Sequence, residues 1–577
     1  MSWVFGAIHD TFSPDAQQRF RSIHSDPIQS YRSEKIYVAV GGLKETCRSG
    51  SFQENESQSK GWAVIGSGLR LRSDDCIFLS SPDWQNLFGQ VEPVFSTIDG
   101  HFCALRWNDD SVEVWIDEIG LRTLYVAPAK EGYLFSTRLD WLAQAASLDN
   151  ISFSELGSAW LLTNKLNYNS PIHNITRIGP GGRARITVNS FTSANQAWTA
   201  RVVPEANSSL VNTLEGFVHP VIAETGSLSL GMSGGFDCRL LLSLLVSQKK
   251  TPFVLHTFGS AKNPDVIIAK DIAGRLQISL TQYDEPLPSV DTTISLLKTY
   301  VAQTGLTGPA SSMLKLRYYE AMHREGKTLI DGGYGEISRR QMGNRLLSKG
   351  TKILGEGDSE NLFPLFAMHR ASIFNQDVVK EMREAAKQEI TEALSGIEAN
   401  SIGAESLVDL FLIRTRVANN SPGPQDWIDS QIVNYMPYSQ PSFLREVFRT
   451  SLKERRNARL YRRTIRERSS VLTRFPLAKD GVTYPYAFTT IPSWIWRTAK
   501  KQLNLRYEEP YRLQLLLHVK EFVQDIVNSN TTRQFSAYDY SKIRNSVSKF
   551  YEGKNEFAPD VDWWLTFEIW RRTLTGK

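Results

Sequence analysis

A glycine pair between an apolar run and a helix-forming run constrains the fold of this 577-residue chain more than any other feature. Leu228 to Met232 predicts a short buried strand, and Cys238 to Leu245 favours a helix. Ser233, Gly234 and Gly235 therefore stand on a strand-to-helix turn. Glycines let the backbone approach a ligand closely there, and the N–H groups together with the positive end of the helix dipole attract an anion.

The complete pattern Ser-Gly-Gly-Phe-Asp is more specific than a glycine pair alone. Ser233 adds a hydroxyl donor, and the Asp237 carboxylate can hold Mg²⁺ that bridges phosphates. The sequence lacks the G-x-x-x-x-G-K-[ST] pattern of loops that serve γ-phosphate transfer. We therefore expect a loop that binds ATP and releases pyrophosphate; a tight turn without a ligand is the alternative. The residues expected to bind ATP here are Met232, Ser233, Gly234, Gly235, Asp237 and Cys238.

The chain is long enough for roughly two to four domains, and its pattern changes once. The first two hundred residues alternate short apolar strands with turns, and a helix is expected at 139–146. From Leu228 on, apolar strands alternate with amphipathic helices, which is typical of a parallel sheet in an α/β domain. Helices dominate beyond about residue 360, with candidates at 377–394, 405–417, 444–456 and 512–527. We place the boundary near residue 205, which gives domains 1–204 and 205–577.

Composition and charge narrow the class of protein. With 41% hydrophobic and 22% charged residues the chain is ordinary and globular, and a net charge of +5 does not by itself imply a polyanion partner. Four widely spaced cysteines fit a reducing compartment rather than a zinc site or a disulfide framework. A basic leader is missing, and so is any apolar run of about 18 residues, so we expect a cytoplasmic protein that does not bind membranes. A homodimer is compatible with these observations.

Arginines concentrate between residues 444 and 468, in a stretch that favours helix. We expect a solvated helical face on which Glu446, Glu454 and Glu467 pair with the arginines; contact with phosphate or another polyanion is the alternative. Nucleic acid is not the expected partner.

Further segments resemble the asparagine synthetase family, including its relatives that make β-lactams and lasso peptides. Downstream of the loop, Leu255 to Gly259 resembles the strand beside the adenine, and Asn263 to Ala273 resembles the S-P-D-x-x-x-A-x-x-x-A helix. Upstream, the family's L-D-G-x-F, D-x-x-G-x-R-P-L-Y, F-S-S-x-x and L-P-P-G-x pieces are similar to Ile98–Phe102, Asp117–Tyr125, Phe135–Leu139 and Ile178–Gly182. The matches occur in the family's order over much of the chain.

The resemblance implies a fold for each half. The N-terminal half would be a glutaminase-like domain of the Ntn type, an αββα sandwich of the class II glutamine amidotransferases. The C-terminal half would be an α/β domain with a parallel sheet, a PP-loop ATP pyrophosphatase with a helical extension. Phe258 and Gly259, and Gly333 in a second loop, would complete the ATP site.

Two departures from the family pattern concern glutamine. Working members carry a cysteine nucleophile directly after the initiator methionine, whereas this chain has Ser2. The N-G-E-I-Y-N segment that supplies an oxyanion donor has no counterpart between Gly61 and Asp75. A serine hydroxyl is the weaker nucleophile for an amide without strong activation, so we expect an inactive glutaminase domain kept as a scaffold. Activity of Ser2 after removal of Met1 stays open.

A third departure lies in the second ATP-side loop. Relatives carry S-G-E-G-A-D-E there, and this chain has Asp331-Gly332-Gly333-Tyr334-Gly335-Glu336. Gly335 takes the place of the metal-binding aspartate, so Asp237 would share Mg²⁺ with Glu336 or Asp331, or the turn would hold no metal. Arg339 and Arg340 follow; they could hold phosphate or a substrate carboxylate, or start a solvated helix.

A segment from Arg474 to Val482 resembles the one that supplies a lysine to the reacting phosphate. Arg474 and Lys479 are the candidates for that cation, and Glu336 is the third candidate catalytic residue. The resemblance implies an ATP- and Mg²⁺-dependent ligase that activates a small-molecule or peptide carboxylate as an acyl-adenylate, which an amine then attacks. The alternatives are an asparagine synthetase using ammonia or glutamine, an RNA-modifying PP-loop enzyme, and a non-catalytic ATP-binding protein.

Overall fold

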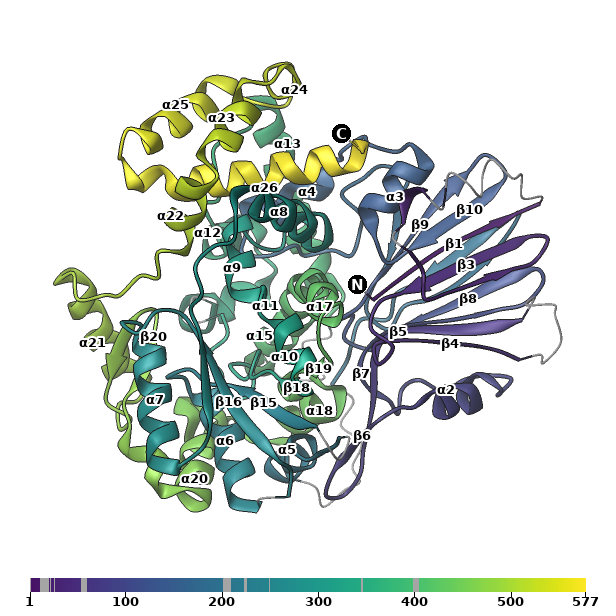
Figure 1. Cartoon of the computed structure of the whole chain (residues 1–577). Helices are drawn as coiled ribbons and strands as arrows, with labels where there is room; N and C mark the ends of the chain where they lie inside the picture. The colour runs from purple at the N-terminus through teal and green to yellow at the C-terminus, as the bar shows by residue number, and fades with distance from the viewer. Residues whose placement is uncertain are drawn as a thin grey trace.

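The computed structural model describes residues 2–10, 20, 22–24, 26–52, 60–200, 209–222, 226–248, 250–343, 346–397 and 404–576. The expected boundary between residues 204 and 205 lies outside the described residues. Antiparallel strands fill the N-terminal part of the chain, and parallel strands with helices follow (Figure 1).

Two sheets stack face to face in the N-terminal part. The first has the strand order β11-β9-β10-β1-β3-β2, and the second has the order β13-β12-β8-β7-β5-β6-β14 with β4 beside β5. The strands of the first sheet are β1 (Trp3–His9), β2 (Gln29–Arg32), β3 (Ile36–Gly41), β9 (Leu124–Ala129), β10 (Gly132–Ser136) and β11 (Thr176–Ile178). Those of the second are β4 (Cys47–Ser51), β5 (Gly61–Leu71), β6 (Cys76–Phe78), β7 (Asp99–Trp107), β8 (Ser111–Ile116), β12 (Arg183–Thr187), β13 (Phe191–Ala194) and β14 (Pro220–Val221).

Both faces of each sheet are apolar, so each sheet packs against the other sheet on one face and against a helix on the other. Val4, Ile65 and Leu105 belong to the core between the sheets. Helix α3 (Leu139–Ala146) shares a core with Trp3 on the outer face of the first sheet, and α2 (Ser81–Phe88) shares another with Trp62 on the outer face of the second. The expected layering of helix, sheet, sheet and helix is therefore present.

The sheet of the C-terminal part has the order β17-β16-β15-β18-β19, and each pair of neighbours is parallel. Its strands are β15 (Ser227–Gly231), β16 (Phe253–Phe258), β17 (Leu280–Tyr283), β18 (Lys327–Ile330) and β19 (Asn434–Tyr435). Helices α6 (Phe236–Gln248) and α7 (Pro264–Leu276) connect the first three strands. The chain order along the sheet reverses at β15, so the crevice beyond the carboxyl ends of β15 and β18 is where open α/β sheets bind ligands.

Helices make up most of the remainder, as expected, but two predicted helices are broken. The principal ones are α4 (Phe153–Leu161), α8 (Val290–Thr304), α13 (Gln376–Ser395), α15 (Ala404–Leu412), α16 (Ala418–Asn420), α17 (Pro422–Asp429), α18 (Pro441–Arg449), α19 (Leu452–Arg455), α20 (Arg459–Arg468), α22 (Tyr511–His518), α23 (Lys520–Asn528) and α26 (Ala558–Thr575). The helix expected at 444–456 ends at Arg449 because Thr450 is extended, and the helix expected at 512–527 divides at Val519.

The two halves share their hydrophobic cores. One core joins Trp3 and Trp141 of the N-terminal part to Trp427 and Trp570 of the C-terminal part. Helix α26 runs back toward α3, so the C-terminus lies close to the first sheet (Figure 1). Among the described residues, the helices are all too short or too polar to cross a membrane.

Candidate functional site

The glycine turn lies where the sequence predicts, between β15 and α6, and it meets the loop that follows β18. A Cβ on Gly332 would lie 3.3 Å from the backbone nitrogen of Cys238, so the two loops touch. Gly234 also packs closely, since a Cβ there would come within 2.5 Å of the Ala478 side chain. These contacts place both loops at the reversal point of the parallel sheet, which is the position expected for a phosphate site.

The N–H groups of the turn already have acceptors. Gly234 donates to Oδ1 of Asp265 at 2.6 Å, and Gly235 donates to Oγ of Ser233 at 3.2 Å. Asp265 begins α7, within the segment that resembles the S-P-D helix. A phosphate on this turn would have to replace the Asp265 carboxylate on the Gly234 N–H.

Asp237 pairs with an arginine. Arg339 donates from Nε to Oδ1 and from Nη2 to Oδ2 of Asp237, both at 2.8 Å. Only 6% of Arg339 is exposed, and although burial lowers the pKa of its guanidinium, the Asp237 carboxylate raises it overall. Of the two alternatives for Arg339 and Arg340, the solvated helix start is wrong: both residues lie in a turn with Asp237 and Asp409 as their acidic neighbours.

The residues present do not fit a protein-held Mg²⁺. A Cβ on Gly335 would lie 2.4 Å from Oδ1 of Asp237, so there is no room at this position for the acidic ligand that asparagine synthetases carry. Glu336 faces Lys479, with Oε1 and Nζ 3.9 Å apart. Among the described residues, three His, Cys, Asp or Glu side chains do not come together anywhere in a way that could hold a metal ion. The guanidinium of Arg339 already pairs with the Asp237 carboxylate, which is the group that would bind the cation.

The two candidate cations of the 474–482 segment differ in position. Strand β20 (Leu477–Lys479) packs against the turn, because the N–H of Ala478 donates to the carbonyl oxygen of Gly234 at 3.0 Å. Lys479 is half-buried beside it, and burial lowers the pKa of its ammonium. The side chain of Arg474 is exposed. Of the two, Lys479 is the cation that the structure brings to the loops.

The strand expected beside the adenine ends next to Glu509, a residue that the sequence analysis did not single out. Gly259 has a φ of +114°, and a Cβ on it would lie 2.7 Å from Oε2 of Glu509. Glu509 accepts hydrogen bonds from Nδ2 of Asn263 at 2.7 Å and from the N–H of Ser260 at 3.3 Å. Phe258 stacks on Tyr318 with ring centroids 5.7 Å apart. Glu509 lies some 250 positions away in the sequence, where no local pattern marks it.

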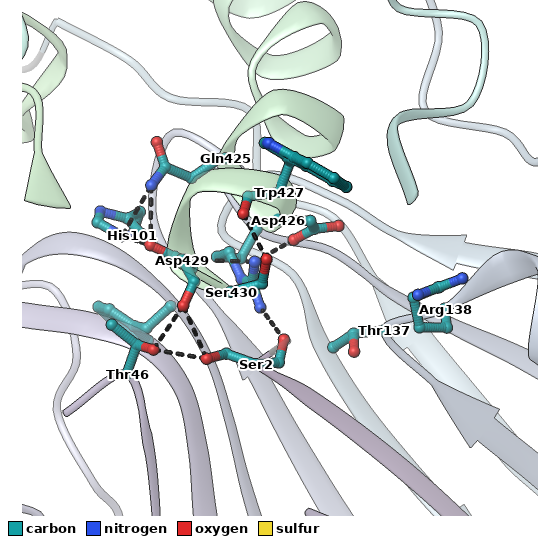
Figure 2. A network of polar contacts seen from close by, with 12 residues as sticks. Ser2, Thr46, His101, Thr137, Arg138, Gln425, Asp426, Trp427, Asp429 and Ser430 are labelled. Atoms are coloured by element: carbon teal, nitrogen blue, oxygen red, sulfur yellow. Dashed lines mark hydrogen bonds and ion pairs between the residues drawn. The ribbon is translucent and has the colours of Figure 1, made fainter. Parts of the chain in front are cut away.

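Ser2 is buried under α17. Its Oγ donates to the carbonyl oxygen of Asp429 at 2.9 Å and lies 2.5 Å from Oγ1 of Thr46, which donates to the same carbonyl. Only 3% of Ser2 is exposed. Figure 2 shows Ser2 and Thr46 joined to the backbone oxygen of Asp429 at the end of α17. The hydroxyl is thus covered by α17 and hydrogen-bonded to its last residue.

The carboxylate of Asp429 organises the surroundings of Ser2. Its Oδ1 lies 2.8 Å from Nε2 of His101 and accepts from Asn434 at 2.7 Å, and its Oδ2 lies 3.3 Å from Nη1 of Arg122. Burial would raise the pKa of Asp429, but His101 and Arg122 hold it below its ordinary value. Burial raises the pKa of Asp426 to about 7 despite its contact with Arg122.

The D-x-x-G-x-R piece explains how Arg122 reaches this cluster. Asp117 accepts from the N–H groups of Gly120, Leu121 and Arg122 at 2.8 to 3.0 Å, which folds the segment into a loop. Gly120 has a φ of +77° and packs against Pro180. The loop aims Arg122 at the carbonyl oxygen of Ser2, to which Nη2 donates at 3.0 Å. Asp117, Gly120 and Arg122 therefore have a structural role in this chain.

The L-D-G-x-F piece is also engaged by the C-terminal half. Asp99 accepts from the N–H and the Oγ of Ser442 at 2.9 and 2.7 Å, and the N–H of Gly100 donates to Oε1 of Gln440 at 2.5 Å. Asp99 is buried. A ligand that needed this carboxylate would have to displace Ser442.

Several arginines of the 444–468 stretch form ion pairs. We expected partners within the stretch, but most of the acidic partners lie outside it. Arg463 contacts Glu454 and Arg449 contacts Glu446, as expected. The other partners lie elsewhere in the sequence: Arg445 with Glu118, Arg455 with Asp409 and Arg468 with Glu215. Five of the nine arginines in the stretch are thus paired with acids in the part of the chain that the structure describes.

Comparison with known proteins finds little. No protein-family model and no curated protein matches the chain. One similar solved structure is described as the allosteric regulatory enzyme of purine biosynthesis, with 10% identity, a TM-score of 0.23, and coverage of 50% of this chain and 82% of that chain. Another is the glutamine phosphoribosylpyrophosphate amidotransferase from B. subtilis in complex with ADP and GMP, with 9% identity, a TM-score of 0.22, and coverage of 57% and 81%. Similarities this weak carry no argument about fold or activity.

Proposed function

We propose that this protein is an ATP-dependent, AMP-forming ligase that activates a carboxylate as an acyl-adenylate and transfers the acyl group to an amine. The observation that carries the proposal is the meeting of the loops after β15 and β18 at the reversal point of the parallel sheet. The Ser-Gly-Gly-Phe-Asp turn between β15 and α6 supports a nucleotide phosphate as the ligand.

A cationic side chain would carry the electrostatic part of the reaction. Lys479 beside the turn can neutralise charge on the α-phosphate, whereas the charge of Arg339 is balanced by Asp237. Because the carboxylates do not fit a protein-held Mg²⁺, we assign no step to a metal. The rest of the rate enhancement would come from holding carboxylate and nucleotide together.

Glutamine is not the proposed nitrogen source, because the Ser2 hydroxyl is covered by α17. The amine would then be free ammonia or an amino group on a second or the same substrate. An asparagine synthetase that uses ammonia is one such enzyme.

The test is pyrophosphate release from ATP by the purified protein over a panel of carboxylates, with ammonium, amines or glutamine. We expect release that requires a carboxylate, is not increased by glutamine, and falls at least about tenfold in Lys479→Met, since one electrostatic contact to a transition state is worth several kcal/mol. Arg474→Met, a change to the exposed neighbour, should leave the rate within about twofold. Glutamine-supported amide formation would contradict the proposal.

A second candidate is a non-catalytic nucleotide-binding protein, which the bidentate pairing of Asp237 with Arg339 favours. Binding of ATP without pyrophosphate release under any substrate would select it. Failure to bind ATP at all would exclude both candidates.

A further inference from the structure

Helix α21 (Thr490–Gln502) presents apolar side chains to solvent at the edge of the molecule. It follows the hairpin of β20 and β21 (Val482–Tyr484), and β21 is its main neighbour (Figure 1). Ile491, Trp494 and Ile495 are each more than half exposed. Because residues three and four positions apart share a face of a helix, these side chains form one apolar stripe that points away from the protein.

Polar residues of α21 face the protein instead. Ser493 is buried. Nη1 of Arg497 donates to Oδ2 of Asp480 at 2.8 Å, and Nζ of Lys500 donates to the carbonyl oxygen of Thr483 at 3.3 Å. An ordinary surface helix has the reverse arrangement, with its apolar residues toward the core and its charged residues outward. Packing within the described part of the chain therefore does not explain the apolar stripe.

The apolar surface continues beyond the helix and is bordered by cations. Leu503 and Leu505, just after α21, are also more than half exposed. The sequence from 490 to 507 contains four basic residues and no acid. Two of these basic residues, Lys501 and Arg506, are exposed. Single apolar residues are normal on a protein surface, but several large ones on one short segment beside cations indicate an interaction site.

Acidic neighbours offset only part of this positive charge. Oδ2 of Asp480 lies 2.8 Å from Nη1 of Arg497 and 3.4 Å from Nζ of Lys501, and Oε1 of Glu508 lies 2.9 Å from Nη1 of Arg506. Two carboxylates thus stand against four basic side chains. Exposed ion pairs contribute little, so Lys501 and Arg506 can exchange these partners for another anion.

The size of the stripe argues against a protein partner. A helix of 13 residues is about 20 Å long and roughly 10 Å wide, so its outer face covers only about 200 Å². A stable protein–protein interface buries about 800 Å² on each partner. A lipid bilayer needs no complementary shape, and tryptophan, isoleucine and leucine beside lysine and arginine are the residue types of helices that lie in its interface.

We propose that α21 and the residues just after it dock on the surface of an anionic phospholipid bilayer. Ile491, Trp494 and Ile495 enter the boundary between headgroups and acyl chains, and Lys501 and Arg506 contact lipid phosphates. The expectation that this chain does not bind membranes rested on the lack of a long apolar run, which a helix needs to span a bilayer but not to lie on it. The proposal is independent of the ligase activity, because the stripe contains no residue of the loops after β15 and β18.

Cosedimentation of the full-length protein with vesicles tests the proposal. The vesicles consist of phosphatidylcholine alone or of phosphatidylcholine mixed with phosphatidylglycerol. We expect binding to the mixed vesicles to be stronger by about fivefold or more, because basic residues near an anionic surface are attracted to it. Trp494→Gln and Ile495→Gln should each weaken this binding about tenfold, since they replace an inserted apolar side chain by an amide. Val91→Gln, a change to an exposed valine after α2, should have no effect.

Three results would overturn the proposal. Lack of binding to both kinds of vesicle is the first. Equal binding by the wild type and Trp494→Gln is the second, because it would mean that charge alone attracts the protein; if Trp494→Gln does not fold, Ile495→Gln decides. The third is a dimer, seen by sedimentation velocity without vesicles, that Trp494→Gln abolishes, since it would assign the stripe to a second copy of the chain.

Discussion

Asp237 and Arg339 show how a single guanidinium changes the chemistry available at a phosphate loop. The two side chains are largely buried and joined by two hydrogen bonds, and Gly335 fits against Asp237 without a gap. A charge-assisted pair with this planar geometry is specific for arginine, because lysine cannot donate in a fork.

Removing the guanidinium should destabilise the protein. Arg339→Met leaves the Asp237 carboxylate buried without its partner, and we expect a loss of about 3–5 kcal/mol in the free energy of unfolding, measured by urea denaturation. Arg185→Met breaks an exposed contact of 3.9 Å with Glu113 and should cost less than about 0.5 kcal/mol. Equal losses in the two variants would show that the Asp237 pair is not structural.

A methyl group at Gly335 should also be costly. In Gly335→Ala the new Cβ would lie 2.4 Å from Oδ1 of Asp237, whose position Arg339 fixes, so we expect a loss of about 1–3 kcal/mol. Gly355→Ala, at a helical glycine with nothing within 4 Å, should be neutral or stabilising by up to about 1 kcal/mol. Thermal unfolding of both variants measures the contrast.

His256, a buried residue of β16 in the parallel sheet, should make the stability depend on pH. Burial lowers the pKa of His256 to about 3 from 6.5, and its Nδ1 lies 2.8 Å from Oγ of Ser229. The unfolded state therefore binds a proton below pH 6.5 that the native state does not, so the contribution is complete above pH 6.5 and is lost as the pH falls. We expect about 2 kcal/mol to be lost between pH 6.5 and 5, at about 1.4 kcal/mol per unit.

Urea melts at both pH values measure this loss in the wild type. His256→Gln should reduce the difference between them, whereas His173→Gln, at an exposed histidine, should not. The same pH dependence in wild type and His256→Gln would assign the proton to another group.

At the scale of elements, α17 decides what the N-terminal sandwich can do. The helix carries Asp429, whose carbonyl oxygen accepts from Ser2 and whose carboxylate meets His101 and Arg122. The helix lies between the sandwich and the parallel sheet (Figure 1), and Asp429 contacts His101 of β7 on one side and Asn434 of β19 on the other. A nucleophile at position 2 is thereby held in a structural network.

A thiol at position 2, as in asparagine synthetases, should not give this protein glutaminase activity. In Ser2→Cys the sulfur would lie under α17 as the hydroxyl does, so we expect release of ammonia from glutamine to stay at the level of the uncatalysed blank. An enzyme-coupled glutamate assay, with the unmodified protein alongside, measures it. Hydrolysis well above the blank would mean that α17 moves aside and that glutamine can reach position 2.

At the scale of the whole molecule, the shared cores tie the halves into one unit. The core that contains Trp3 and Trp570 has members from both ends of the chain, and α26 contacts α3. Separation of the halves would expose this apolar surface to water, at about 25 cal/mol per Å².

We therefore expect a single cooperative unfolding transition. Far-ultraviolet circular dichroism and tryptophan fluorescence should give the same urea midpoint. The fluorescence reports on both halves, because buried tryptophans occur in the sandwich and in the core that the two halves share. Two separated midpoints would show that the sandwich and the parallel-sheet part unfold independently and that the interdomain cores contribute little to stability.

The sequence by itself determined the local elements. The strand-turn-helix around Ser233, the helix at 139–146 and the long helix near 377–394 follow from residues that are neighbours in the chain, so period and turn chemistry suffice. Contacts between distant residues were decided by tertiary structure. Asp237 meets Arg339 across 102 positions and Ser2 meets Asp429 across 427. The sequence marked Asp237 as a metal ligand and left Ser2 open as a nucleophile, because no local pattern encodes which side chain the fold brings to face another.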